Sequence, residues 1–225
     1  MHFKKSNMME KEKFIITINR EFGSGGREIA CKVAELLGVK FYDKEILSVL
    51  TEKYDLSVEE MERIKAKKTN WWSEFCRFYS QNSSVASYTG GRQILAVNRE
   101  ISSIELFKAE EKILKELADQ ESCVILGRTG FHIFKDYPNA MRLMLIANHD
   151  FRLKRIMDKY NLDEKKAEEK IIETDTAREN FTKTFAKVSR YDARNYDMVM
   201  NVSGFSTDAV ADFIAKNVRL KYPEY

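Results

Sequence analysis

Short apolar runs and longer amphipathic stretches alternate along this chain. The run at 14–18, FIITI, is mostly apolar and β-branched, as expected of a strand buried in a parallel sheet. Apolar residues then recur at helical spacing at positions 29, 33, 36 and 37. Further strands are expected at 39–42, 123–126, 141–147 and 198–202, and helices at 101–118, from 149 onward, at 161–187 (one helix or a pair) and at 207–220. The alternation predicts an α/β sandwich around a parallel sheet.

A glycine-rich turn, GSGG at 23–26, joins the first strand to the first helix. Glycines let the backbone curl tightly with its N–H groups pointing inward. A helix that starts there adds unpaired N–H groups and the positive end of its dipole, and both favour an anion. The turn therefore predicts a phosphate cradle, although a tight turn without a ligand has the same pattern. The residues expected to bind a nucleotide here are Gly23, Ser24, Gly25, Gly26, Arg27 and Glu28.

This turn departs from the Walker A motif, G-x-x-x-x-G-K-[ST]. An ungapped alignment on the strand puts Arg20 at the first glycine and Gly25 at the second. Gly26 then stands where the lysine belongs, and Arg27 where the serine or threonine belongs. The backbone cradle is kept, while both functional side chains are changed. Arg27 could replace the charge of the lysine with a planar guanidinium group suited to phosphate.

Composition and charge narrow the function classes. A chain of 225 residues fits one domain, or one domain with a sizeable insertion. The net charge of +3 is too small to argue for a nucleic-acid or membrane partner. Cys31, Cys76 and Cys123 lie far apart without metal-ligand spacing, which favours a reduced cytoplasmic setting. No stretch approaches the ~18 apolar residues of a membrane span, and residues 1–13 lack the apolar region of a signal peptide.

The segment from about 69 to 92 is rich in aromatic residues among Ser, Asn and Gly, without a clean period. Its rings could stack on a nucleotide base. They could also form an interface, which leaves a homodimer open. The simplest interpretation is that they pack on a small core of their own. The aromatic residues are Trp71, Trp72, Phe75, Phe78, Tyr79 and Tyr88.

Six segments carry a resemblance to a known family: ITINREFGSGGREIACKVAELLG, FYDKEIL, CVILGRTGFHIF, DFRLKRI, TDTARENF and NYDMVMN. In this order and spacing they resemble the P-loop nucleoside monophosphate kinases, and among these the cytidylate kinase-like family. The resemblance implies a single P-loop NTPase domain over 1–225, a three-layer α/β/α sandwich with a five-stranded parallel sheet. It also implies a monophosphate-binding insertion at about 55–100 and a helical lid at about 150–190.

The activity that this resemblance implies is transfer of the γ-phosphoryl group of ATP, with Mg²⁺, to a small nucleotide, CMP or dCMP. Such a transfer needs both nucleotides held in line and the moving charge neutralised, so arginines should converge on one pocket. Arg152 and Arg155 match the lid arginines of the family and share a helix face, as a solvated basic face also would. We assign them, together with Arg27, as catalytic.

Four residues are expected to bind the acceptor. Asp175 and Arg178 resemble the family's D-S-x-R, in which Asp and Arg read the cytosine and its phosphate; without the resemblance, an ion pair on a solvated helix explains them as well. Arg128 in LGRTG resembles the family's G-R-D and would bind the acceptor phosphate. Asp43 would contact the monophosphate or order a metal ion, and it could equally cap a helix.

Several departures from the family's pattern favour a second hypothesis. Gly26 replaces the lysine, no hydroxyl follows it, and Thr129 replaces the family's Asp. After Asp43, the relatives' small residues and arginine become Lys44, Glu45 and Val49. The alternatives are a nucleotide-binding protein with little transfer activity, or a kinase for a different small acceptor.

Overall fold

The computed structural model describes residues 13–43 and 103–223. Its strands span Ile15–Arg20 (β1), Lys40–Tyr42 (β2), Cys123–Leu126 (β3), Ala140–Ile146 (β4) and Met198–Asn201 (β5). They form one five-stranded sheet in the order β2-β3-β1-β4-β5, and all neighbouring pairs are parallel. Because β1 is central, its carboxyl end opens between the ends of β3 and β4, the edge at which ligands bind in open α/β sheets.

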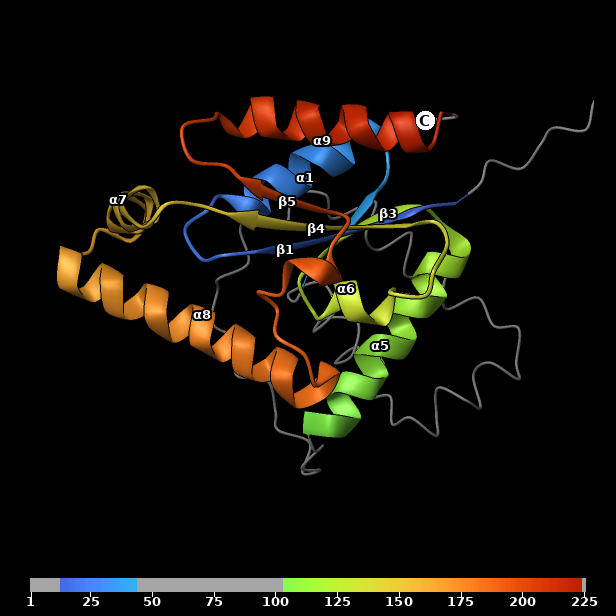
Figure 1. Ribbon diagram of the computed structural model, residues 1–225, viewed down its shortest axis with the longest axis horizontal. Coiled ribbons are helices and arrows are strands. Elements are labelled where there is room, and N and C mark those ends of the chain that lie inside the picture. The colour runs from blue at the N-terminus through green and yellow to red at the C-terminus, as the bar shows by residue number, and fades with distance from the viewer. Residues whose placement is uncertain (1–12, 44–102, 224–225) are drawn as a thin grey trace, which may run out of the picture.

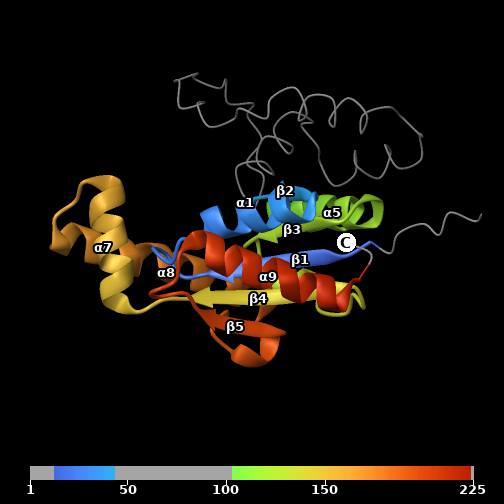
Figure 2. The same ribbon diagram turned by 90° about the horizontal axis from the view of Figure 1, so that it is seen from above.

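Helices cover both faces of this sheet. They span Gly26–Leu37 (α1), Ser103–Gln120 (α5), Gly130–Ile133 (α6), His149–Tyr160 (α7), Glu164–Ala186 (α8) and Thr207–Lys221 (α9). Figures 1 and 2 show α1 and α9 side by side on one face, with α5, α6 and α8 toward the other. In the same views α7 lies beyond the carboxyl ends of β1 and β4. The predicted three-layer α/β/α sandwich is confirmed.

Two apolar cores lie on opposite faces of the sheet, since side chains alternate along each strand. In β1, Ile16 and Ile18 belong to the core under α1 and α9, whereas Ile15 belongs to the core under α5. Phe107 of α5 stacks on Phe185 of α8 with ring centroids 4.4 Å apart. The second core therefore also fixes the C-terminal end of α8.

The structure refines several boundaries. The segment predicted at 161–187 contains a single helix, because Asn161 ends α7 in the left-handed region and Asp163 caps α8 through the Lys166 N–H at 2.9 Å. The short α6 and a 3₁₀ helix at Ala193–Asn195 were not predicted, since one turn leaves little periodicity to detect. The predicted insertion at 55–100 and its aromatic residues lie outside the described residues.

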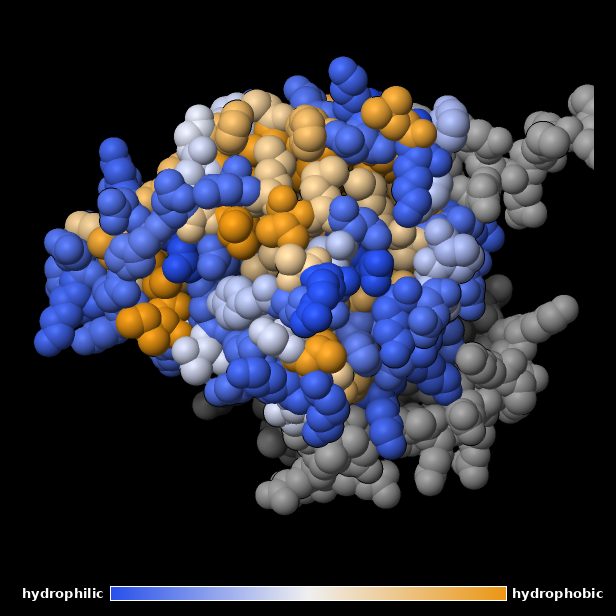
Figure 3. All heavy atoms as spheres, in the orientation of Figure 1, coloured by the Kyte–Doolittle hydropathy of each residue, from blue (hydrophilic) through white to orange (hydrophobic). Residues whose placement is uncertain are grey.

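The surface in Figure 3 is mostly hydrophilic over α7 and more apolar over the middle of the face, along β5 and below α9. The edge position of β5 accounts for part of this, because Val199 stays 42% exposed there. None of the helices in 13–43 and 103–223 has both the length and the apolar character that crossing a membrane requires.

Helices α7 and α8 form a hairpin with a small core of its own. Ile156 of α7 and Ile171 of α8 are buried in it, and Phe22 from the glycine-rich turn packs against the same cluster. At the first turn of α7, His149 Nε2 lies 2.5 Å from Glu168 Oε2 of α8. The hairpin is thus joined to the turn by packing and is closed by a polar pair.

Replacing His149 with Gln should weaken the hairpin mainly at low pH. Hydrogen bonds to Glu168 and then to Asp150 raise the pKa of His149 above its ordinary value of 6.5. A raised pKa in the folded state stabilises the fold below the unfolded pKa, and the contribution is lost as the pH rises through the folded pKa. The difference in melting temperature between the protein and His149→Gln should therefore be larger at about pH 5.5 than at about pH 8.5. Equal differences at the two pH values would contradict this role.

Candidate functional site

The turn after β1 places a helix N-terminus at the carboxyl end of the central strand. Arg20 is the last residue of β1, and α1 begins at Gly26. Gly25 precedes the helix in the left-handed region (φ +81°), and the Ile29 N–H donates to its carbonyl at 3.1 Å. In a helix, the N–H groups ahead of that bond have no intrahelical acceptor and favour an anion. The backbone of the turn is therefore suited to phosphate.

Close neighbours surround the glycines of the turn. A Cβ on Gly23 would lie 2.9 Å from the Cβ and from the carbonyl oxygen of Arg152 in α7. One on Gly25 would lie 3.1 Å from Nη2 of Arg155, also in α7. Both glycines also have positive φ, which disfavours any side chain. The first turn of α7 thus approaches the glycine turn closely enough to bring two arginines to it.

Asp175 connects this turn to three arginines. Its side chain is buried in α8, and Oδ1 accepts a hydrogen bond from the Phe22 N–H at 3.0 Å. Oδ2 lies 2.6 Å from Nη1 of Arg152, while Arg178 and Arg190 each place an Nη1 atom 3.5 Å from Oδ1. One carboxylate therefore joins the turn, α7, α8 and the segment that follows α8.

The arginine cluster, defined here as Arg20, Arg152, Arg178 and Arg190, carries an excess of positive charge. The carbonyl oxygen of Arg20 accepts from Arg178 Nη1 at 3.3 Å and from Arg190 Nη2. Burial, together with repulsion from Arg178 and Arg190, lowers the pKa of Arg20 to about 9. Burial and then Arg190 also lower the pKa of Arg178. Four guanidinium groups gathered around one carboxylate leave an excess of positive charge at this strand end, and such an excess favours an anion.

Glu28 brings its own carboxylate to the start of α1. Its Oε1 lies 2.8 Å from Nζ of Lys159 and 3.8 Å from Nη2 of Arg155. Burial opposes ionisation, but the hydrogen bonds from Lys159 and from its own backbone N–H outweigh it and lower the pKa of Glu28. The predicted role of Glu28 as a backbone phosphate donor stays a prediction.

Arg27 and Asp43 form an ion pair with each other, with Nη2 and Oδ2 2.8 Å apart. The Arg27 side chain is half exposed, and the Asp43 side chain is buried at the end of β2. The pair brings together two residues that the sequence placed in different parts of the site. The structure therefore gives Arg27 a carboxylate partner whose charge also acts on Arg20 of the arginine cluster. The assignment of Arg27 as the substitute for the Walker lysine stays a prediction.

Arg128 lies in an unusual turn after β3. Gly127, Arg128 and Thr129 all have positive φ (76°, 51° and 57°), a conformation that costs energy for a β-branched residue and is often found at functional sites. The Arg128 guanidinium pairs with the buried Glu110 of α5 and lies 4.8 Å above the Phe181 ring. Burial lowers the pKa of Arg128 to about 10. Its predicted phosphate partner would compete with Glu110.

The structure brings only some of the predicted residues together. Arg152, Asp175 and Arg178 are in contact, and Arg155 reaches the turn through Glu28. Sequence reasoning missed Arg20 and Arg190. Arg20 could have been found, because it ends the apolar strand directly before the glycine turn. Arg190, which is 1% exposed, had no comparable signal.

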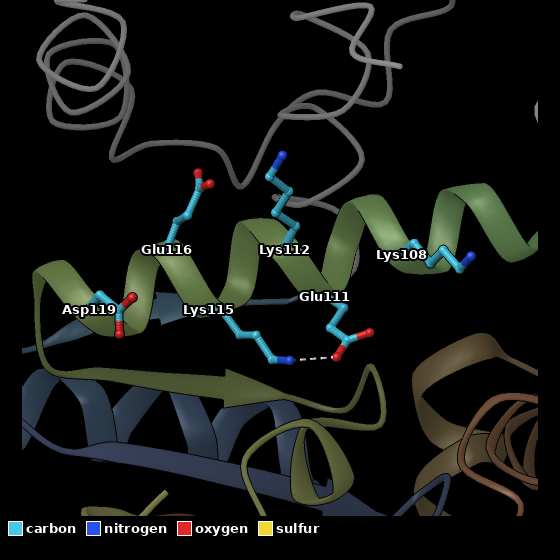
Figure 4. A pocket seen from close by; sticks show the side chains of 6 residues that line it. All are labelled: Lys108, Glu111, Lys112, Lys115, Glu116 and Asp119. Carbon is cyan, nitrogen blue, oxygen red and sulfur yellow. Dashed lines mark hydrogen bonds and ion pairs between the residues drawn. The ribbon is translucent and has the colours of Figure 1, made fainter. Parts of the chain in front are cut away.

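A hollow of about 290 Å³ lies along α5 but does not resemble a substrate site (Figure 4). Its lining carries both signs of charge along one helix, and Lys115 pairs with Glu111 at 2.7 Å, a spacing of four residues that is common on helices. None of its lining residues belongs to the arginine cluster. They are Lys108, Glu111, Lys112, Lys115, Glu116 and Asp119.

Comparison with known proteins gives a family and a fold. The model described as the cytidylate kinase-like family matches residues 15–204. An uncharacterized protein from Eubacterium ventriosum ATCC 27560, solved by crystallography, is 23% identical, with a TM-score of 0.65 over 92% of this chain and 98% of that one. Shikimate kinase from Bacteroides thetaiotaomicron is 12% identical, with a TM-score of 0.47 over 92% of this chain and 97% of that one.

A curated relative matches only in part. Uronate isomerase from Corynebacterium glutamicum is 27% identical over 100 residues, which are 44% of this chain. The chain spans 19% of the length of that relative, so the match says nothing of the isomerase's activity here.

Asp175→Asn should destabilise the protein by about 3 kcal/mol, because it leaves buried guanidinium groups without their carboxylate. Urea denaturation would measure the change. Asp192→Asn is the matched control, since Asp192 pairs with Arg194 at 2.7 Å on the surface and should hardly change the midpoint. Equal effects of the two variants would contradict the central role given to Asp175.

Proposed function

Because the chain belongs to the cytidylate kinase-like family, we propose that it is a kinase that transfers the γ-phosphoryl group of ATP to a nucleoside monophosphate, CMP or dCMP. The observation that carries the proposal is the arginine cluster beside the glycine turn. Phosphoryl transfer requires little covalent help from the protein, and depends on positioning and on neutralising charge. An excess of guanidinium groups at a helix N-terminus supplies both.

The glycine turn fits the phosphates of ATP. A side chain at Gly23 or Gly25 would crowd Arg152 or Arg155 of α7, so the glycines keep these arginines close to the turn. The start of α1 offers N–H donors beside them. Bound ATP would supply the phosphoryl group, and the lid arginines Arg152 and Arg155 stand against the turn where they could neutralise its charge.

Mg²⁺ would reach the site mainly as part of the nucleotide complex. Within 13–43 and 103–223, no group of three His, Cys, Asp or Glu side chains is arranged to hold a metal ion. Mg²⁺ commonly keeps several waters and binds through phosphates and one or two carboxylates. Asp43, which pairs with Arg27, and Glu21, which accepts from the Ala147 N–H at 2.9 Å, follow β2 and β1 and are our candidates for such a contact.

The acceptor is the part of the proposal that rests most on family resemblance. Asp175 and Arg178 match the residues that read cytosine in relatives, and a carboxylate could accept from the cytosine amino group, which uracil lacks. The Asp175 oxygens are engaged by Phe22 and Arg152 in this structure, so a base would have to share or replace these contacts. Arg128 would likewise have to exchange Glu110 for a phosphate.

A second candidate is a nucleotide-binding protein with little transfer activity. The observation that favours it is the absence of the Walker lysine and hydroxyl, whose positions carry Gly26 and Arg27. Arg27, moreover, is paired with Asp43. In this case ATP binds to the glycine turn but its γ-phosphoryl group is not transferred.

Incubation with ATP and Mg²⁺ and each common nucleoside monophosphate in turn should separate these candidates. We expect CDP or dCDP to form at least about tenfold faster than the other diphosphates, because one mismatched polar group costs at least that factor. Chromatographic separation of the nucleotides would measure the products. AMP or GMP as the best acceptor would refute the pyrimidine assignment, and ATP binding without any transfer would favour the second candidate.

A further inference from the structure

The side chain of Arg20 occupies the space that a side chain at position 26 would need. A Cβ on Gly26 would lie 2.6 Å from the Cβ and 2.7 Å from the Cγ of Arg20, closer than real Cβ atoms approach other atoms. The strand end and the helix start therefore cannot both carry a side chain in this backbone. In the Walker A motif the strand-end position is glycine and the helix-start position is lysine. In this chain the strand end carries the cation and the helix start carries the glycine.

The Arg20 side chain extends from the start of α1 to the turn after β3. A Cβ on Gly127 would collide with Nη1 of Arg20, so a second glycine makes room for the guanidinium group. The side chain thus runs from Gly26, the first residue of α1, to Gly127, which follows the carboxyl end of β3. This is the region where the phosphates of a nucleotide are expected.

No carboxylate neutralises this guanidinium directly. Within 13–43 and 103–223, the Arg20 side chain makes no ion pair within 4.0 Å and no hydrogen bond. Arg178 and Arg190 repel this guanidinium group, while Asp43 and Asp175 attract it from beyond ion-pair distance; burial and the repulsion outweigh that attraction and lower the pKa of Arg20. A largely buried cation that lacks a direct ion pair is stabilised by an anion that enters from outside.

We propose that Arg20 is the phosphate-binding cation of this nucleotide site, in place of the Walker lysine, and that Gly26 and Gly127 are glycines because Arg20 passes between them. The inference rests on the proposed function for the identity of the ligand, a nucleoside triphosphate. The planar guanidinium group would donate to two phosphate oxygens at once, which an ammonium group cannot do with the same geometry.

The test is an exchange of side chains, with ATP, tripolyphosphate and adenosine as probes in titration calorimetry. Arg20→Met keeps most of the aliphatic stem and removes the charge. It should weaken ATP and tripolyphosphate binding about tenfold or more, the usual loss for a charged hydrogen-bonding partner, and leave adenosine binding unchanged. Gly26→Lys alone should also weaken binding, since it forces Arg20 aside.

The double variant Arg20→Gly with Gly26→Lys restores the Walker arrangement and should recover most of the affinity. Its matched control, Arg20→Gly with Gly26→Met, relieves the same crowding without a charge and should not recover. Thermal melting would confirm that every variant is folded. Full affinity in Arg20→Met, equal recovery by both double variants, or a parent that binds neither ATP nor tripolyphosphate would overturn the inference.

The binding experiments on Arg20 and the kinase assay can fail independently of each other. If the exchange pattern holds in binding while no nucleoside monophosphate is phosphorylated, the assignment of Arg20 stands and the kinase proposal fails. If CDP forms as expected while Arg20→Met binds ATP normally, the kinase proposal stands and the assignment of Arg20 fails.

Discussion

The carboxylate of Asp175 is the contact on which the geometry of the site depends. It accepts from the Phe22 N–H in the glycine turn and pairs with Arg152 of α7, Arg178 of α8 and the buried Arg190. The contact with Phe22 joins two residues that lie 153 positions apart in the sequence. In a poorly solvated space, guanidinium groups at such distances repel one another strongly. The position of the turn relative to the helical hairpin therefore depends on this charge as well as on the packing of Phe22.

Stabilisation of the fold does not by itself explain the arginine cluster and its carboxylate. Enclosed ion pairs lose in desolvation much of what they gain in attraction, and well-packed apolar residues often stabilise a fold as well. In this cluster the cost of desolvation exceeds the attraction further, since burial and neighbouring cations lower the pKa of both Arg20 and Arg178. Buried guanidinium groups that repel one another at the carboxyl edge of a parallel sheet are expected where a bound anion supplies the missing negative charge. A nucleotide would then stabilise the folded state by binding to it.

The strands and helices could be predicted from the sequence more fully than the contacts within the candidate site. The bounds of the strand Cys123–Leu126 were predicted to the residue, because a short continuous apolar run is typical of a strand buried on both faces. Asp175 looked like part of a solvated helix, yet it lies at helical spacing from the buried Ala167 and Ile171, and that stripe was a usable signal. The pairing of Arg128 with Glu110 could not be predicted, since it depends on how α5 meets the turn after β3.

A motif that is defined by the residue type at each position can miss a cation that a neighbouring position supplies, as we propose for Arg20 and Gly26. The phosphate needs a cation beside the helix N-terminus, and either of two crowded positions can provide it. At the strand end the cation is anchored on β1, which is hydrogen-bonded to β3 and β4 on both sides. A group on so rigid an element loses little freedom when the anion binds, and its longer side chain still reaches the cradle. Under the proposed assignment of Arg20, the cation that the Walker motif takes from the helix start comes from the strand end instead.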